Sequence, residues 1–261
     1  MQYRLLVIAI ISLFSSCSPR IFLPDRANVP MLREAGEMKL TTSLKLQNQS
    51  EAPGTGWSPS VDFAASPFRN LGLMASYRST DKYANEDFWL SNSERHDSIR
   101  YTGSRFEFGA GYYSRFGGKG LFEIYGGGGF GEIRRNNLKN MSGNYHADYY
   151  RIFLQPAVGF THRDIIEFSG GMRFTYQRYA NFTSNTPGMV HSFTTPPADI
   201  DRVSFYFIEP FVNFSVGAKY VKFNIQPGFS NNISSPSLDN QVSFYLSMGV
   251  TFQLAPRFWK G

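Results

Sequence analysis

The chain has 261 residues, of which 42% are hydrophobic, 16% aromatic and 18% charged, and its net charge is +6 at pH 7. No internal apolar run reaches the about 18–20 residues that a membrane-spanning helix needs, and the scattered positive charge does not indicate nucleic-acid binding. So many aromatic and so few charged residues are unusual in a soluble enzyme. They are natural in a β-barrel, where lipid-facing and lumen-facing side chains alternate and mean hydropathy, here −0.29, averages out.

Residues 1–16 have the features of a signal peptide. Arg4 precedes an apolar run from Leu5 to Phe14, and a run of about ten residues suits a secretory signal but is too short to cross a membrane as a helix. The only cysteine of the chain, Cys17, follows this segment directly. A single cysteine also excludes an internal disulfide framework.

The motif at the end of this segment, Phe14-Ser15-Ser16-Cys17, resembles the lipobox of bacterial lipoproteins, with Phe14 where leucine is usual. The resemblance implies that Cys17 becomes the first residue of the mature protein and carries acyl chains, two or more of which anchor a protein stably. The alternative is an ordinary signal peptide with an incidental cysteine. Residues 17–36 show no periodicity, so we predict a lipid-anchored linker there.

From residue 37 onward, apolar and polar side chains alternate with a period of two, which is typical of strands that are wet on one face and apolar on the other. We predict that the apolar side chains face lipid and the polar ones face the lumen of a barrel. The predicted strands are Glu37–Gln47, Trp57–Ser66, Leu71–Arg78, Ser104–Ser114, Leu121–Ile133, Tyr149–Thr161, Ile165–Tyr176, Phe205–Val216, Tyr220–Ser230 and Val242–Leu254.

The connections between these strands alternate in length. The tight ones are Pro67–Asn70, Arg115–Gly120, His162–Asp164 and Gly217–Lys219. The longer, polar ones are Asn48–Gly56, Ser79–Gly103, Arg134–Asp148, Tyr179–Val203 and Asn231–Gln241. This alternation is typical of outer-membrane barrels. The sequence therefore predicts an all-β fold over residues 37–261, a closed antiparallel transmembrane β-barrel of about ten strands with short periplasmic turns and long outer loops.

Three prolines, Pro156, Pro210 and Pro227, fall inside predicted strands, each after a Gln or Glu. Because proline removes a hydrogen-bond donor from the ladder, we expect β-bulges at these positions. The alternative is that the strands are wrongly drawn there.

Two further segments, together with the lipobox, resemble a known family. Phe122-Glu-Ile-Tyr-Gly-Gly-Gly-Gly-Phe-Gly131 and Asn28-Val-Pro-Met-Leu-Arg-Glu-Ala-Gly-Glu37 look like segments of small outer-membrane β-barrel lipoproteins of Bacteroidetes-type bacteria. The resemblance implies an outer-membrane location, a lipid anchor on the periplasmic side and membrane lipid around the barrel. That family has no assigned activity, so the resemblance implies no catalytic residue and no cofactor.

Charged residues of both signs fall on the predicted inward face. Buried charges cost several kcal/mol each unless they are paired, and ten strands enclose little more space than eight, where side chains fill the interior. We therefore predict a salt-bridged polar network that fills the lumen; the alternatives are a narrow passive channel and a proton-sensitive gate. The network residues are Arg105, Glu107, Glu123, Arg151, Glu167, Arg173, Glu209 and Lys222.

A glycine motif in the fifth predicted strand has the spacing of a dinucleotide-binding fingerprint. Gly126, Gly128 and Gly131 match G-x-G-x-x-G, but that fingerprint requires a helix to begin at the motif, and here a strand is predicted to continue through it. We interpret the glycines as positions that make room for bulky lumen side chains and allow curvature.

The histidines, His96, His146, His162 and His191, do not have the spacing of a metal site. His146 and Asp148, with Asp199 and Asp201, could outline a hydrolase site at the outer rim, in which a carboxylate orients the imidazole that activates water. The spacing does not match the ten-stranded outer-membrane proteases. We therefore predict no catalytic, cofactor or metal site, and the rim hydrolase, a protease or lipid-modifying enzyme, is the alternative.

Apolar residues also occur in the predicted outer loops, at Phe88-Trp89-Leu90, Met189-Val190 and Phe193. Such residues can contact a surface protein or a glycan, or fold over the barrel mouth. The predicted role is structural or surface-interacting rather than enzymatic.

Overall fold

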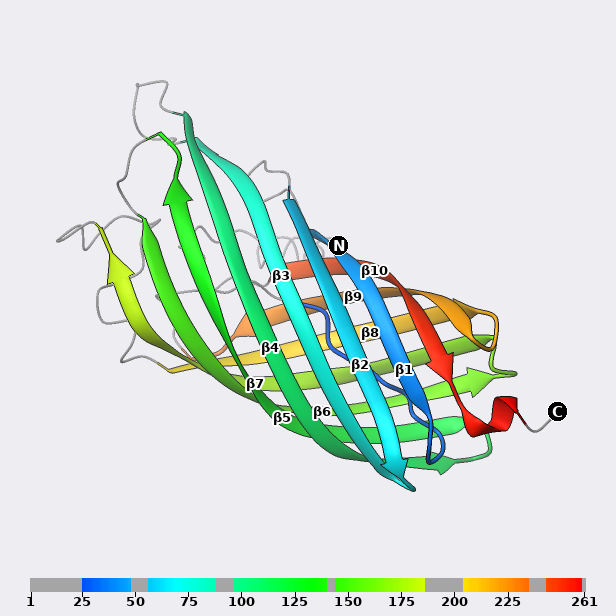
Figure 1. Cartoon of the computed structure of the whole chain (residues 1–261). Coiled ribbons are helices and arrows are strands. Elements are labelled where there is room, and N and C mark those ends of the chain that lie inside the picture. Colours follow the sequence, from blue (N-terminus) through cyan, green and yellow to red (C-terminus); the bar gives the residue numbers. More distant parts are fainter. Residues whose placement is uncertain are drawn as a thin grey trace, which may run out of the picture.

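A computed structural model of the chain describes residues 25–47, 56–87, 96–139, 144–185, 204–234 and 243–259. These residues form a closed antiparallel barrel in which each strand pairs with its sequence neighbours and β1 pairs with β10 (Figure 1). Among the described residues, no helix is long and apolar enough to cross a membrane. The strands are β1 (Met38–Gln47), β2 (Gly56–Phe68), β3 (Leu71–Asp87), β4 (His96–Phe116), β5 (Gly120–Asn137), β6 (Tyr145–His162), β7 (Ile166–Ser184), β8 (Ser204–Gly217), β9 (Val221–Asn232) and β10 (Ser243–Leu254).

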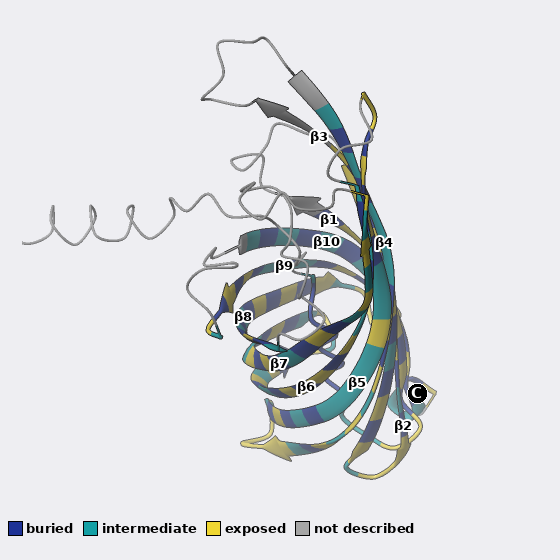
Figure 2. Ribbon diagram, turned by 90° about the vertical axis from the view of Figure 1, so that its left-hand side faces the viewer, coloured by how far each residue is buried: buried dark blue, intermediate teal, exposed yellow. Residues whose placement is uncertain are grey.

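Side chains along each strand alternate between an exposed outer face and a buried inner face, which gives the striped ribbons of Figure 2. Phe108 is 55% exposed on the outer face of β4, whereas Glu107 beside it is 1% exposed and points inward. This is the reverse of a water-soluble protein, where large apolar patches are rarely exposed. The predicted all-β fold, a closed transmembrane β-barrel of ten strands, is confirmed.

The connections at one end of the barrel are short, as predicted. We call this the turn end, and the opposite end the loop end. Between β2 and β3 the turn is Arg69-Asn70, and Asn70 adopts a left-handed backbone with φ of 65°. Its side chain donates a hydrogen bond of 2.7 Å to the carbonyl of Tyr113, which ties the turn to β4.

Strands β3 to β7 extend further toward the loop end than predicted, so parts of the expected loops Ser79–Gly103, Arg134–Asp148 and Tyr179–Val203 are strand. Figure 1 shows β3, β4 and β5 rising beyond β8, β9 and β10. In these extensions apolar side chains such as Ile99 are buried on the inner face beside polar ones such as Lys82 and Arg135, and the outer face carries charges, as at Arg100. The outward apolar pattern is therefore interrupted by charged side chains toward the loop end, while several apolar side chains point inward there.

The bulges expected at the three prolines are absent, and that prediction is wrong. The strands also continue through the prolines, so they were correctly drawn there. Each proline keeps its register with one neighbouring strand and leaves a gap in the ladder on its other side, where its missing N–H would have donated. The retained pairs are Pro156 with Ile124, Pro210 with Met172, and Pro227 with Leu246.

The glycine-rich part of β5 makes room inside the barrel. A Cβ atom at Gly129 would lie 2.8 Å from Cγ of Glu107, and one at Gly131 would lie 2.7 Å from the hydroxyl of Tyr149. The stretch is strand from Gly120 to Asn137, with no helix beginning at the motif. This agrees with the predicted role of the glycines and leaves no dinucleotide-binding turn.

Candidate functional site: a filled lumen and a rim cluster

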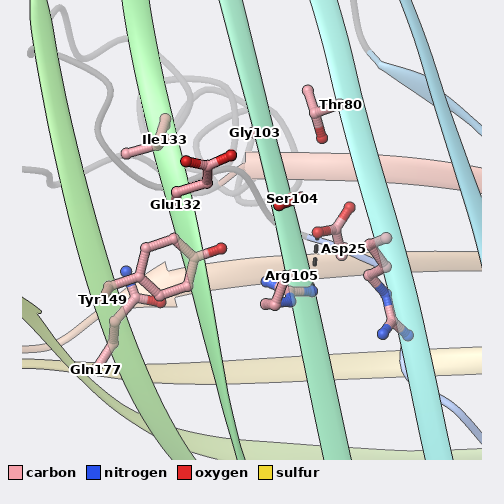
Figure 3. Close-up of a pocket in the computed structure, with 10 residues that line it drawn as sticks. Asp25, Thr80, Gly103, Ser104, Arg105, Glu132, Ile133, Tyr149 and Gln177 are labelled. Carbon is pink, nitrogen blue, oxygen red and sulfur yellow. Dashed lines mark ion pairs between the residues drawn. The ribbon is translucent and has the colours of Figure 1, made fainter.

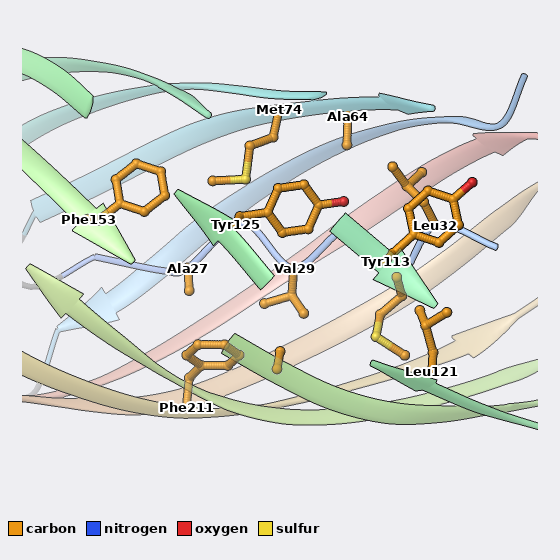
Figure 4. Close-up of a cluster of buried hydrophobic side chains, with 12 residues drawn as sticks. Ala27, Val29, Leu32, Ala64, Met74, Tyr113, Leu121, Tyr125, Phe153 and Phe211 are labelled. Carbon is orange, nitrogen blue, oxygen red and sulfur yellow. The ribbon is translucent and has the colours of Figure 1, made fainter. Parts of the chain in front are cut away.

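The chain passes through the barrel before it enters β1. Residues 25–36, which we call the lumen segment, lie inside the strands, and Arg26 to Leu32 are buried. Figure 4 shows Ala27, Val29 and Leu32 among side chains of the surrounding wall. The sequence did not predict this placement, because the segment has no periodicity and we expected a linker over residues 17–36.

Two glutamine side chains hold the main chain of the lumen segment. Gln226 accepts a hydrogen bond of 2.8 Å from the amide of Ala27 and donates one of 3.0 Å to the carbonyl of the same residue. Gln155 donates one of 2.7 Å to the carbonyl of Asn28. Each glutamine directly precedes a strand proline. Because these amides satisfy backbone groups that are buried away from water, the segment fits the lumen without strand pairing.

The lumen segment runs from the loop side to the turn side of the barrel. Asp25 pairs with Lys45 at 2.9 Å, near the end of β1 at the loop end. Arg33 forms an ion pair with Asp164, in the turn between β6 and β7. The chain therefore enters the lumen from the loop side and leaves it at the turn end, where β1 begins.

A cluster of ion pairs lies where the segment reaches the turn end. Arg257, just after β10, contacts Glu34 at 3.1 Å, Glu37 at 3.0 Å and Asp164 at 3.2 Å. Burial lowers the pKa of Arg257, but hydrogen bonding to Glu37 and the charges of Glu37 and Asp164 outweigh burial and raise the pKa above its ordinary value. Arg257 thus stays charged and joins the C-terminal end to the lumen segment.

The largest group of predicted lumen residues surrounds one carboxylate, that of Glu107. Arg173 lies 2.9 Å from it, Arg78 3.2 Å, and Arg105 and Arg151 3.4 Å each. Planar guanidinium groups can share a carboxylate in this way because each presents several donors in a fixed geometry. Three of these arginines also pair with a second acid: Arg105 with Asp25, Arg78 with Asp62, and Arg151 with Glu209.

The remaining predicted residues lie nearer the turn end. Glu167 accepts hydrogen bonds of 2.6 Å from Lys222 and 3.1 Å from Lys39. Glu123 stands apart from the ion pairs and accepts a hydrogen bond of 2.9 Å from the amide of Met31. All eight residues of the predicted network are buried in the lumen.

The prediction missed Asp62 and Arg78, which belong to the same network. Both occupy inward positions of the period-two pattern, Asp62 between the outward-facing Val61 and Phe63 and Arg78 directly after the outward-facing Tyr77, so the alternation could have identified them. Asp25 and Arg26 were missed for a different reason. They lie in the lumen segment, where the sequence has no such pattern.

One small cavity, of about 20 Å³, lies on the loop side of this network (Figure 3). Asp25 and Arg105, which pair at 2.8 Å, line it together with Tyr149 and Gln177. A volume of this size has room for about one water molecule.

A second cluster lies at the loop end, on the outer face. Glu132 of β5 is directly opposite Asp148 of β6. The Nε2 atom of His146 lies 3.4 Å from Oε2 of Glu132 and 3.5 Å from Oδ1 of Asp148. The alternative rim hydrolase would combine His146 and Asp148 with Asp199 and Asp201, which lie outside the described residues. The structure instead adds Glu132, whose proximity to the histidine is not evident from the sequence.

Other predicted features fall outside the described part of the chain. These are Cys17, His191, the apolar loop residues 88–90, 189–190 and 193, and the side chain of His96. His162 ends β6 at the turn end, at the opposite end of that strand from His146.

No protein-family model and no curated protein matches the chain. Solved structures resemble it in fold only. The translocator domain of the autotransporter NalP from Neisseria meningitidis is 9% identical with a TM-score of 0.46, covering 84% of this chain and 89% of that one. An outer-membrane channel from Pseudomonas putida F1 is 9% identical with a TM-score of 0.46, covering 90% and 100%. The transport unit of the autotransporter AIDA-I from Escherichia coli is 10% identical with a TM-score of 0.43, covering 95% and 97%.

Proposed function

We propose that the protein is an outer-membrane β-barrel with a closed, side-chain-filled lumen and a structural or surface-interacting role. The exposed apolar band supports a membrane location, with lipid around the strands. The observation that carries the closed state is the lumen segment, which is bonded to the wall through its main chain by Gln155 and Gln226. Displacing the segment would break these hydrogen bonds and leave the side chains of Gln155 and Gln226 without these partners, so the contacts favour the closed state.

The ion pairs around Glu107 support the same proposal. A conducting pore needs sites that an ion can enter and leave readily. Here the arginines are already occupied by carboxylates of the wall and of the lumen segment. The contacts of this protein with other molecules would then lie at the loop end, where a surface protein or a glycan can approach.

Conductance in planar bilayers tests the closed lumen. We expect the purified full-length protein to insert without producing stepwise currents, because the lumen segment and the paired charges obstruct the passage. Heat-modifiable migration on a gel, with folded and boiled samples running differently, checks that the inserted protein is a barrel. Reproducible ohmic channels from such folded protein would contradict the proposal and favour the narrow passive channel.

Lipidation of Cys17 stays a prediction. The direction of the lumen segment supports an N-terminus that leaves the barrel at the loop end, which would place an acyl anchor on the outer surface instead of on the periplasmic side. A peptide tag inserted between Cys17 and Asp25 is therefore expected to bind antibody on intact cells. A tag in the turn between β8 and β9 is the matched control and should be accessible only after permeabilisation. If the N-terminal tag, like the control tag, binds antibody only after permeabilisation, the anchor is on the periplasmic side.

A further inference from the structure

We propose that Glu132, His146 and Asp148 form a binding site for a divalent transition-metal cation of the zinc type. The site lies on the outer face of β5 and β6, beyond the lipid-facing band. Its three ligand atoms lie within 4.8 Å of one another, and each side chain is neither fully buried nor fully exposed. This inference does not depend on the proposed closed lumen.

The strand register assembles the site. Glu132 and Asp148 are opposite each other in the β5–β6 pair, and His146 lies two residues further along β6. Side chains two apart on a strand share a face, so all three point outward. Phe130 and Tyr150, the next outward pair toward the membrane, are 60% and 41% exposed. The cluster therefore lies where the outer face changes from aromatic to charged.

The two distances from His146 are longer than ordinary hydrogen bonds and match the separation of neighbouring ligands around a metal. Nitrogen–oxygen hydrogen bonds have lengths of about 2.7–3.2 Å, whereas Nε2 of His146 lies 3.4 Å from Glu132 and 3.5 Å from Asp148. Ligands at the zinc distances of about 2.0–2.2 Å in a tetrahedron are separated by about 3.3–3.6 Å. The Nε2 atom is itself shielded from solvent and has no hydrogen-bond partner among the described residues.

The surroundings hold the ligands in place. Glu132 and Asp148 lie directly opposite each other on neighbouring strands, and two carboxylates in this position repel each other, so their positions depend on other contacts. Asn181, in a left-handed backbone with φ of 51°, donates a hydrogen bond of 2.9 Å to Oδ2 of Asp148, while Oδ1 is the oxygen nearer His146. This residue is at the register shift between β6 and β7, and bulges commonly redirect a side chain.

The donor set indicates the class of metal. One imidazole and two carboxylates suit zinc and neighbouring divalent transition metals, and three protein ligands leave a fourth position open. Arg134 works against the cation, because its guanidinium lies 2.8 Å from the same Oε2 of Glu132. We therefore expect moderate affinity that rises when this charge is removed.

Zinc titration of the chelator-treated, folded full-length protein in detergent tests the proposal. We expect one Zn²⁺ per chain, and a Co²⁺ derivative with the strong visible absorption of a tetrahedral site. Glu132→Gln, His146→Ala and Asp148→Asn should each weaken binding about tenfold or more. Arg134→Gln should tighten it by about fivefold, because a neighbouring positive charge is removed.

His162→Ala is the matched control, since it removes a half-buried histidine at the other end of β6. It should leave both stoichiometry and affinity unchanged. Heat-modifiable migration of every variant shows that the barrel still folds. Absence of stoichiometric zinc binding, or binding that Glu132→Gln and His146→Ala leave unchanged in folded protein, would overturn the proposal.

Discussion

Replacing Glu107 by glutamine is expected to lower the free energy of unfolding of the barrel by about 3–5 kcal/mol, because removing one partner of a buried ion pair leaves the other charge uncompensated. Glu107 is the shared partner of Arg78, Arg105, Arg151 and Arg173. Glutamine keeps the shape of the side chain, so the change tests charge and not packing. Urea unfolding in detergent, followed by tryptophan fluorescence or by migration on a gel, measures the effect.

Asp81→Asn is the matched control for this variant. Asp81 pairs with Arg100 at 2.7 Å, but both side chains are exposed, at 45% and 39%. Exposed ion pairs contribute little because water and salt screen them. We expect the midpoint of unfolding to change far less than in Glu107→Gln. If the two variants unfold alike, the charges inside the barrel are solvated and the lumen is wetter than its contacts indicate.

The strands of the barrel could be predicted from the sequence because each of them carries its own pattern. In β4 the alternation places Phe106 and Phe108 on one face and Arg105 and Glu107 on the other. It predicts the direction of these side chains without reference to the neighbouring strands. The pattern ends at the lipid boundary. Beyond it, apolar side chains such as Ile133 point inward. A prediction that follows outward-facing apolar residues therefore ends the strand too early.

The lumen segment could not be predicted in this way. Its residues contact the wall on several sides, so polar Asn28 and apolar Val29 follow each other without a period. Its partners are also distant in sequence, as the separation of 199 residues between Ala27 and Gln226 illustrates. The alternation of side chains within one strand does not predict contacts with a segment that is distant in sequence.

The rim cluster shows the same limit across strands. The sequence places His146 and Asp148 on one face of a strand, because they are two residues apart. That Glu132 joins them depends on the register between β5 and β6, and register follows from the whole hydrophobic pattern and the turn geometry, not from the motif. His146 and Asp148 could therefore be paired from the sequence, whereas Glu132 could not be added to them.

Deletion of residues 25–32 is expected to convert the closed barrel into a conducting one. The deletion removes Asp25 and the buried residues from Arg26 to Leu32, including Val29, Met31 and Leu32, and leaves the residues of the ten paired strands unchanged. Planar-bilayer recordings should then show stepwise currents that the unaltered protein lacks. Deletion of residues 48–55, a stretch of the same length between β1 and β2, is the matched control and should leave the barrel closed.

The opened lumen is expected to prefer anions. The deletion removes one acid, Asp25, and one base, Arg26, so the charge of the opened lumen is that of the wall. Buried basic side chains outnumber buried acidic ones there: Lys39, Lys45, Arg78, Arg105, Arg151, Arg173 and Lys222 against Asp62, Glu107, Glu123, Glu167 and Glu209. Rings of positive side chains select anions in pores, and the reversal potential in a salt gradient measures the preference. A folded deletion variant that stays closed would mean that the side chains of the wall, centred on Glu107, are sufficient to obstruct the passage. The lumen segment would then stabilise the barrel without acting as its seal.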